Sequence, residues 1–363
     1  MKHGGDIYSD GILKGKTLID FSSNINPLGV PKSFSEHIEE AVSMLTVYPD
    51  IKYRALKSNI KEYLDKSYSY FGQNERKFGF NDKNILLGNG ASEILDLAIK
   101  SLKSITVVVP SFVDYEDNAR KHGLTLKYSY LKENFNYDYE DILEKVKTTE
   151  GLIIGNPNNP NGCKIHKEKF KDILDYCEEN KKIILIDEAF IEFTLDINNS
   201  FMDLVNDYNC LFIVRAITKF YGLPGVRFGF GITKNEKIID YFNLMQNPWN
   251  VNCFAEVAVK YSLKDIEYIK QSINWIRVQR DKMLNELKNI KFIDKVYNTY
   301  GNYILIKLRD INCNELYEKL KEQEIIIRKC DNYKGLDNKF IRVAIKDENL
   351  NLKLIDALKS IKM

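Results

Sequence analysis

The chain has 363 residues and is 44% hydrophobic, which is enough to bury a large core and to form two domains. Its 53 lysines and arginines nearly balance its 51 aspartates and glutamates, giving a net charge of +2, and the basic residues are spread along the chain. This balance argues against nucleic-acid binding and against attraction to an anionic membrane.

The cysteines and the apolar runs bear on where the protein works. The six cysteines lie far apart without a Cys-x-x-Cys pair, which argues against both a disulfide framework and a zinc site. The four histidines form no metal-binding pattern either, so we expect no metal. The first residues are polar, so no signal peptide is expected, and no apolar run approaches the roughly 20 residues of a membrane helix. We therefore expect a cytoplasmic protein.

The first part of the chain is irregular and then becomes helical. Residues 1–35 are punctuated by glycines, asparagines and prolines, which favour turns. A helix is predicted over residues 35–45, a turn at Tyr48-Pro49-Asp50 and a second helix over residues 53–71.

From residue 84 the pattern alternates between short apolar strands and amphipathic helices. Strands are predicted at 85–87, 105–109, 152–154, 183–186 and 211–214, and helices at 91–102, 113–121 and 167–179. This alternation predicts an α/β fold with a mostly parallel sheet and helices on both faces. The carboxyl ends of its strands would form the ligand-binding edge.

After residue 252 the alternation stops, and we expect a second, smaller α+β domain. A long helix is predicted over residues 264–289, strands over 303–308, 325–327 and 340–345, and helices over 314–323 and at the end of the chain. The expected organisation is an N-terminal arm with part of the small domain (1–47), a large domain (48–250) and a small C-terminal domain (251–363).

A lysine in a glycine-rich turn is the strongest sign of chemistry. Lys219 follows an apolar strand, and partial burial there would favour a neutral amine that can form a Schiff base with an aldehyde. Arg227, eight residues later, is suited to binding a phosphate. The pair suggests pyridoxal phosphate (PLP), although the turn by itself favours a solvated lysine in a loop.

Other loops at predicted strand ends carry polar or planar groups. Gly88-Asn89-Gly90-Ala91-Ser92 precedes a helix and could admit a phosphate, or it is a tight turn with a helix cap. Asp187 could pair with a protonated pyridine nitrogen, or it caps a helix or binds a metal. Asn159 could donate to a ring hydroxyl, or its loop is only a turn. Phe112 could stack on a ring, or it belongs to the core.

Two arginines lie in or beside strands of the predicted small domain. Arg342 stands inside the apolar run Phe340-Ile-Arg-Val-Ala-Ile345, and Arg328 lies beside another strand. An arginine in such a strand needs an anionic partner, which a surface salt bridge could also supply. Together the two raise the prospect of a doubly anionic substrate.

Taken in order, these loops resemble the fold-type I PLP enzymes, the aspartate aminotransferase superfamily, over essentially the whole chain. Within it the sequence is similar to the branch of histidinol-phosphate aminotransferases and threonine-phosphate decarboxylases. His3-Gly4-Gly5, the Asp20–Gly29 run and Gln246–Asn252 resemble the decarboxylase family more closely. Phe190 stands where the aminotransferases usually carry a tyrosine. Ala216 departs from the pattern, since a serine that contacts the cofactor phosphate is common there.

The resemblance implies a role for each of these residues. Lys219 would form the Schiff base and then transfer protons, Asp187 would pair with the pyridinium, Asn159 would hold the ring hydroxyl and Phe112 would stack on the ring. The cofactor phosphate would be bound by Gly90, Ala91, Ser92, Thr218 and Arg227, with Tyr48 reaching it from the partner subunit of a homodimer. Arg342 would take the substrate carboxylate, and His3, Asn24 and Arg328 would surround the substrate phosphate.

The reaction implied is PLP-dependent decarboxylation of L-threonine O-3-phosphate to 1-amino-2-propanol O-phosphate, in cobalamin synthesis. The alternative is a histidinol-phosphate aminotransferase, because both substrates combine an amine with a phosphate. A PLP-binding regulator or a silent homologue is a third possibility. The absence of a basic patch argues against the regulator, and retention of Lys219 with Asp187 argues against the silent homologue.

Overall fold

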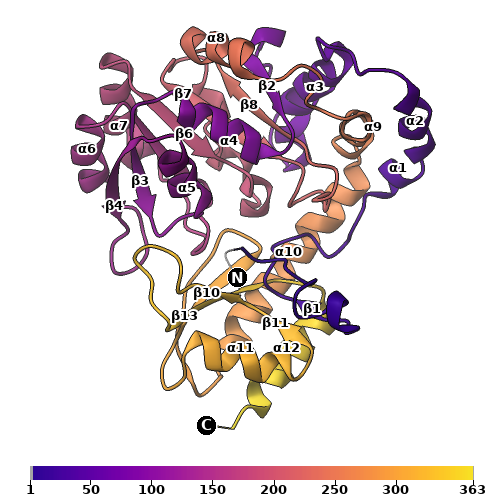
Figure 1. Cartoon of the computed structure of the whole chain (residues 1–363), viewed down its shortest axis with the longest axis vertical. Helices are drawn as coiled ribbons and strands as arrows, with labels where there is room; N and C mark the ends of the chain where they lie inside the picture. The colour runs from indigo at the N-terminus through magenta and orange to yellow at the C-terminus, as the bar shows by residue number, and fades with distance from the viewer. Residues whose placement is uncertain (1–2, 363) are drawn as a thin grey trace.

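The computed structural model describes residues 3–362 (Figure 1). Its larger part is built on a seven-stranded sheet with the strand order β2-β8-β7-β6-β5-β3-β4. The strands are β2 (Ile85–Gly88), β3 (Ser104–Val109), β4 (Thr125–Tyr130), β5 (Gly151–Gly155), β6 (Ile183–Asp187), β7 (Leu211–Ala216) and β8 (Gly229–Thr233).

One strand of this sheet runs against the others. β8 pairs antiparallel with both β2 and β7, whereas every other pairing in the sheet is parallel. The carboxyl ends of β2, β3, β5, β6 and β7 therefore lie at one edge, and β8 begins at that same edge. The predicted α/β class with a mostly parallel sheet is confirmed.

Helices cover both faces of the sheet, because neighbouring residues along each strand point to opposite sides. Ile153 and Leu185 belong to an apolar cluster with α4 (Ala91–Lys100), α5 (Asp114–Lys121) and α8 (Glu236–Met245). Ile154 and Ile186 belong to the other cluster, with α3 (Arg54–Tyr70), α6 (Tyr139–Lys147) and α7 (Lys167–Glu179). Burial on both sides explains why these strands are almost purely aliphatic.

The second part of the chain forms a smaller sheet of order β12-β13-β10-β9, drawn in orange and yellow in Figure 1. Its elements are β9 (Ile293–Val296), β10 (Tyr303–Leu308), β12 (Arg328–Lys329), β13 (Phe340–Ala344), α11 (Cys313–Lys321) and α12 (Glu348–Ser360). The N-terminal arm lies beside this part, because β1 (Ile19–Asp20) pairs in parallel with β11 (Ile325–Ile326). The described start of the chain therefore lies close to the smaller sheet (Figure 1).

Two helices connect the two parts of the chain. The single helix predicted over residues 35–45 is wrong, because the structure has two short helices there. α9 (Cys253–Ser262) and α10 (Ile266–Leu287) follow the large sheet. The 35–45 region is instead divided into α1 (Lys32–Ser35), α2 (Ile38–Ser43) and a 3₁₀ turn, Met44–Thr46. His37 interrupts the helix with a φ of −115°, and its ring stacks on Tyr261 of α9 at 3.8 Å. Tertiary contact therefore overrides the local helical preference.

Two strands of the large sheet, β4 and β8, were not predicted from the sequence. β8 reads Gly-Phe-Gly-Ile-Thr, and its glycines indicate a loop. Its glycines are required by packing, since a Cβ on Gly231 would lie 2.2 Å from the Phe212 ring. β4 is an edge strand whose outward residues are exposed. Across residues 3–362, no helix is both long and apolar enough to cross a membrane.

Candidate functional site

A cavity of about 300 Å³ lies at the edge where the parallel strands end. All of the site residues predicted from the sequence line it except Gly90 and Tyr48. Those lining it are His3, Asn24, Ala91, Ser92, Phe112, Asn159, Asp187, Thr218, Lys219, Arg227, Arg328 and Arg342. Residues from both sheets and from the N-terminal arm therefore converge on one space.

Lys219 lies in the loop after β7, and its environment favours the neutral amine. Burial lowers the pKa of Lys219 to about 8, and the positive charges of Arg342 and Arg227 act in the same direction. The N-terminal arm holds the loop, because the Asn26 N–H donates to the Lys219 carbonyl at 3.1 Å and its Nδ2 donates to the Phe220 carbonyl at 2.7 Å. Lys219 thus combines a reactive amine with a fixed backbone.

Asp187 ends β6 and lies against the same cavity. Its Oδ2 accepts a hydrogen bond from the Tyr115 hydroxyl at 2.7 Å, and its Oδ1 accepts one from the Ala189 N–H at 2.9 Å. Burial raises the pKa of Asp187, while these two hydrogen bonds and the nearby Lys219 oppose the rise. The carboxylate is therefore oriented from two sides.

The start of α4 and Arg227 form a cationic corner of the cavity. Gly90 precedes the helix with a φ of +84°, and a Cβ there would lie 2.4 Å from Arg227 Nη2. Arg227 has a φ of +58°, a strained conformation that an arginine rarely adopts. The free N–H groups of the helix start and the guanidinium together suit an anion such as a phosphate.

The two predicted arginines of the small sheet stand side by side. Arg328 in β12 is paired directly with Arg342 in β13, and both are buried. Arg342 donates through Nη1 to Asn159 Oδ1 and through Nη2 to the Ser22 carbonyl at 2.7 Å. Its buried Nε and the buried Oδ1 of Asn24 have no protein partner within residues 3–362. Such groups are expected to be satisfied by a bound ligand or water.

The mouth of the cavity carries His3 and Phe112. The two rings lie 6.1 Å apart between centroids, and His3 Nε2 is 3.4 Å from Asp114 Oδ1 at the start of α5. The arm packs closely on itself there, since a Cβ on Gly4 would lie 2.1 Å from the Ser22 carbonyl oxygen. His3 therefore reaches across from the arm to the large sheet.

Tyr48 does not reach this cavity within its own chain. Its side chain is 80% exposed, and its ring lies 4.9 Å from that of Trp249 on the surface. Gly90 does not line the cavity either, but it lies close to Arg227, which does. The structure thus separates Tyr48 from the other predicted site residues.

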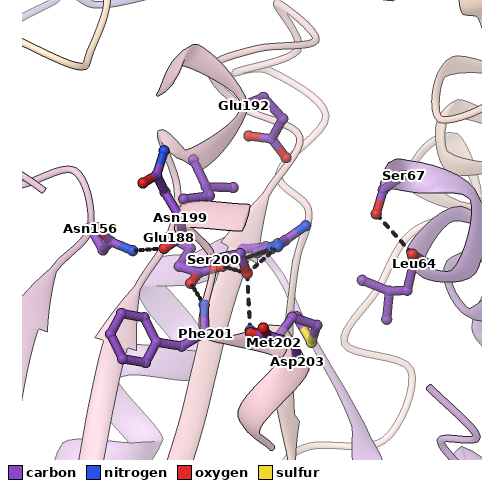
Figure 2. Close-up of polar contacts among 12 residues, drawn as sticks. Leu64, Ser67, Asn156, Glu188, Glu192, Asn199, Ser200, Phe201, Met202 and Asp203 are labelled. Carbon is purple, nitrogen blue, oxygen red and sulfur yellow. Dashed lines mark hydrogen bonds and ion pairs between the residues drawn. The ribbon is translucent and has the colours of Figure 1, made fainter. Parts of the chain in front are cut away.

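A buried polar network surrounds Glu188, the residue that follows Asp187 in the chain (Figure 2). Glu188 Oε2 accepts from Arg215 Nε at 3.1 Å and from the Ser200 hydroxyl at 2.7 Å. Arg215 Nη2 donates to the Ser200 oxygen at 2.7 Å, and Glu188 Oε1 accepts from the Phe201 N–H at 2.7 Å. The network ties the end of β6, which carries Asp187, to the end of β7, which leads to Lys219.

Sequence reasoning missed Asn26, Tyr115 and this network. Tyr115 lies three residues after Phe112, so the two side chains share one side of the chain, and that spacing was an available signal. Asn26 stands in a glycine- and proline-containing run without a residue type that indicates its partner. Arg215 was visible inside an apolar strand, but nothing in the sequence names Glu188 as its partner.

The residues present fit PLP. A buried lysine of lowered pKa can react with the aldehyde, and the oriented Asp187 can face a protonated ring nitrogen. The Gly90–Arg227 corner suits the phosphate, and Phe112 offers a planar face. Ala216, in place of the serine expected there, lines the cavity with a methyl group.

Comparison with known proteins gives a family and two different reactions. A family model described as aminotransferase class I and II matches residues 16–358. A protein of Caldanaerobacter subterraneus subsp. tengcongensis, provisionally named a threonine-phosphate decarboxylase, is 39% identical over 99% of this chain and 94% of its own. The threonine-phosphate decarboxylase of Salmonella typhimurium is 28% identical over 99% and 96%.

A solved structure points to the other reaction. It is described as the histidinol-phosphate aminotransferase from Clostridium acetobutylicum, and it is 48% identical to this chain. It aligns with a TM-score of 0.88 and covers 94% of this chain and 98% of its own. The names therefore agree on the kind of enzyme and differ on the reaction. The chain belongs to the aminotransferase class I and II family, and its cofactor is pyridoxal 5′-phosphate.

Proposed function

We propose that this protein catalyses the PLP-dependent decarboxylation of L-threonine O-3-phosphate to 1-amino-2-propanol O-phosphate, in cobalamin biosynthesis. The direct pairing of Arg328 with Arg342 carries the proposal. Residues that are paired across antiparallel strands have Cα atoms about 4.5–5.5 Å apart, so the two guanidinium groups can serve two anionic groups of one small molecule. The substrate has a carboxylate and a phosphate on adjacent carbons, which matches this arrangement.

The wall near Lys219 supports the same reaction. Phe190 is buried there, with the Lys219 Nζ 5.8 Å from its ring centroid and the Tyr303 ring 5.0 Å away. A tyrosine at this position would place a hydroxyl beside the cofactor ring, and Phe190 provides none. The cavity, at about 300 Å³, is at the small end for a ligand site and has to hold both the cofactor and the substrate, which favours a compact substrate.

The site residues divide the work of the mechanism between them. When bound, PLP withdraws electrons from the bonds at the substrate Cα. Arg342 would hold the carboxylate, and Arg328, His3 and Asn24 would hold the phosphate, so that these side chains fix the orientation of the bonds at the substrate Cα. The protein thereby selects which bond breaks by orientation.

Lys219 and Asp187 complete the machinery. Lys219 would bind the cofactor through Nζ, and the same Nζ would be the group in the cavity that can carry a proton for Cα. Asp187 stabilises the positive charge of the ring nitrogen. Asn159 holds the ring hydroxyl, Phe112 stacks on the ring, and Ala91, Ser92, Thr218 and Arg227 hold its phosphate.

We also propose that the protein is a cytoplasmic homodimer in which Tyr48 reaches the partner's cofactor phosphate. Large apolar side chains are exposed around Tyr48, which suits an interface between copies. They are Leu45, Val47 and Ile51, which are near Tyr48 in the sequence, and Trp249, whose ring lies 4.9 Å from that of Tyr48. The cysteines in the described part of the chain are all free and buried, which fits a reducing compartment.

The second candidate is a histidinol-phosphate aminotransferase, favoured by the activity named for the 48% identical structure from Clostridium acetobutylicum. The two reactions separate in one experiment. The purified protein with PLP is incubated with L-threonine O-3-phosphate and, separately, with histidinol phosphate plus 2-oxoglutarate. Release of CO₂ only in the first supports the decarboxylase. Formation of glutamate only in the second overturns it.

A further inference from the structure

Tyr115 is the one side chain outside the proposed machinery that contacts Asp187 directly among the hydrogen bonds of residues 3–362. Its hydroxyl lies 2.7 Å from Asp187 Oδ2. The phenol comes from α5, whereas Asp187 ends β6, so the contact joins a helix to the floor of the cavity. Tyr115 is 2% exposed, and its ring meets Phe112 edge to face at 5.7 Å.

The direction of this hydrogen bond follows from the chemistry of the two groups. Burial and the adjacent Asp187 raise the pKa of Tyr115 well above its usual value, so the phenol keeps its proton and donates it. A donor supplied to a carboxylate favours the ionised form. Tyr115 therefore works against the burial that would otherwise neutralise Asp187.

The other groups around Asp187 do not replace this donor. The Ala189 N–H binds the other carboxylate oxygen, Oδ1. The charge of protonated Lys219 lowers the pKa of Asp187, but that charge is lost when the Lys219 amine binds the cofactor. Glu188 is paired with Arg215. The Tyr303 hydroxyl donates its hydrogen bond to the Asn158 carbonyl at 2.7 Å. Oδ2 is thus held by the phenol.

We propose that Tyr115 is a positioning residue that fixes the rotation of the Asp187 carboxylate and keeps it charged toward the cofactor ring nitrogen. The proposal rests on the function proposed above for Asp187. Without the phenol, Asp187 is more readily protonated and holds the ring nitrogen proton less well. A ring that loses this positive charge withdraws fewer electrons, so the amine-linked nitrogen of the bound cofactor becomes more basic.

The test uses Tyr115→Phe in the PLP-loaded protein, with Tyr63→Phe as the matched control. Tyr63 is also buried and also donates to a buried carboxylate, Glu192, at 3.0 Å, but it does not contact Asp187. The measurements are the dissociation constant for PLP and the pH midpoint of the visible absorption band of the bound cofactor. Asp187→Asn, alone and combined with Tyr115→Phe, completes the set.

The expected result is specific to Tyr115. Tyr115→Phe weakens PLP binding about tenfold and moves the pH midpoint upward by roughly half a unit or more. Tyr63→Phe leaves both values unchanged, and in the Asp187→Asn background the Tyr115 substitution adds nothing. Thermal unfolding of each variant without cofactor records any general loss of stability.

Three outcomes would overturn the inference or its premise separately. If Tyr115→Phe matches the wild type while Asp187→Asn shifts the midpoint, Tyr115 has no positioning role and Asp187 keeps its own. Equal shifts in Tyr115→Phe and Tyr63→Phe indicate a general packing effect and reject the inference. If Asp187→Asn itself leaves the spectrum unchanged, the role proposed for Asp187 is wrong. None of these readouts depends on which reaction the enzyme catalyses.

Discussion

At the scale of single residues, the site depends on burial, which disfavours the charged forms of Lys219 and Asp187 relative to water. Lys219 is buried beside two cationic arginines, so its proton is held more weakly than usual. Asp187 is buried too, but hydrogen-bond donors oppose its neutralisation. The same burial thus lowers the pKa of the Lys219 amine, with its neighbours acting in the same direction, and raises the pKa of Asp187, where the neighbours oppose the rise.

The first prediction concerns the capture of PLP by the protein without cofactor. Because only the neutral amine attacks the aldehyde, the rate of covalent capture should rise with pH and level off above about 8, the pKa of Lys219. Stopped-flow absorbance in the visible range measures it. Lys219→Ala should show no such band, and a rate that keeps rising up to the ordinary lysine pKa would contradict the assignment.

The second prediction concerns Arg342. Arg342→Lys keeps the charge but cannot reach Asn159, the Ser22 carbonyl and a carboxylate together, so kcat/KM should fall by roughly 10- to 100-fold. Steady-state CO₂ release from L-threonine O-3-phosphate measures the loss. Arg309→Lys, at an exposed surface pair with Asp294, is the control and should leave kcat/KM unchanged.

At the scale of elements, the site is held by contacts between adjacent strands and by one helix start. The Glu188–Arg215 ion pair joins β6 to β7 below Asp187 and Lys219. Gly90 lets the start of α4 come close to Arg227. Both features bring groups from different elements into contact. Neither involves Lys219 or Asp187, so each can be tested while the proposed catalytic residues stay unchanged.

The third prediction concerns the buried ion pair. Arg215→Met leaves Glu188 buried without its cation, which costs about 3–5 kcal/mol and should lower Tm by roughly 5–10 °C. Adding Glu188→Met should recover part of the loss, because no unpaired charge remains. The exposed pair of Lys282 and Glu348 provides the comparison, and Lys282→Met should cost less than about 1 kcal/mol. Equal losses of stability for both pairs would argue against a special role of the buried Glu188–Arg215 pair.

The fourth prediction concerns the phosphate corner. Gly90→Ala should weaken PLP binding at least roughly tenfold, because the new Cβ displaces the Arg227 guanidinium. Gly79→Ala is the matched control, since Gly79 also has a positive φ (+66°) but has open space around its Cβ position. Equilibrium titration with PLP separates the two effects. Equal affinities in the two variants would exclude Arg227 from phosphate binding.

At the scale of the whole molecule, three separate parts of the chain meet at one cavity. The large sheet supplies Lys219 and Asp187, the small sheet supplies Arg328 and Arg342, and the N-terminal arm supplies His3 and Asn24. The arm is joined to the small sheet by the pairing of β1 with β11. In the homodimer that we propose, a second copy of the chain would add Tyr48, which does not line the cavity of its own chain.

The fifth prediction concerns this second copy. Val47→Asp introduces a charge into the exposed apolar face beside Tyr48, where Val47 is 68% exposed, and should convert a dimer into monomers with weaker PLP binding. Analytical ultracentrifugation measures the mass, and titration measures the affinity. Leu13→Asp, at a residue 78% exposed on the N-terminal arm, is the control. A wild-type protein that is monomeric would reject the interface.

The sequence by itself determined the class of the fold and the identity of most cavity residues. Short aliphatic strands alternating with amphipathic helices allow little besides a parallel sheet, because strands buried on both faces need helices on both sides. Since the ligand edge of such a sheet is known in advance, Phe112, Asn159, Asp187 and Lys219 could be assigned to one place from their positions at strand ends.

The tertiary structure alone decided which side chains touch one another. That Tyr115 donates to Asp187, that Asn26 holds the Lys219 loop and that Arg215 pairs with Glu188 depends on segments that are distant in the sequence. The glycine-rich strand β8 and the interrupted helix near His37 likewise follow from packing against neighbours. A sequence pattern reflects the preference of each residue for a backbone conformation and for burial. Its contact partners depend on how distant segments pack together in the folded chain.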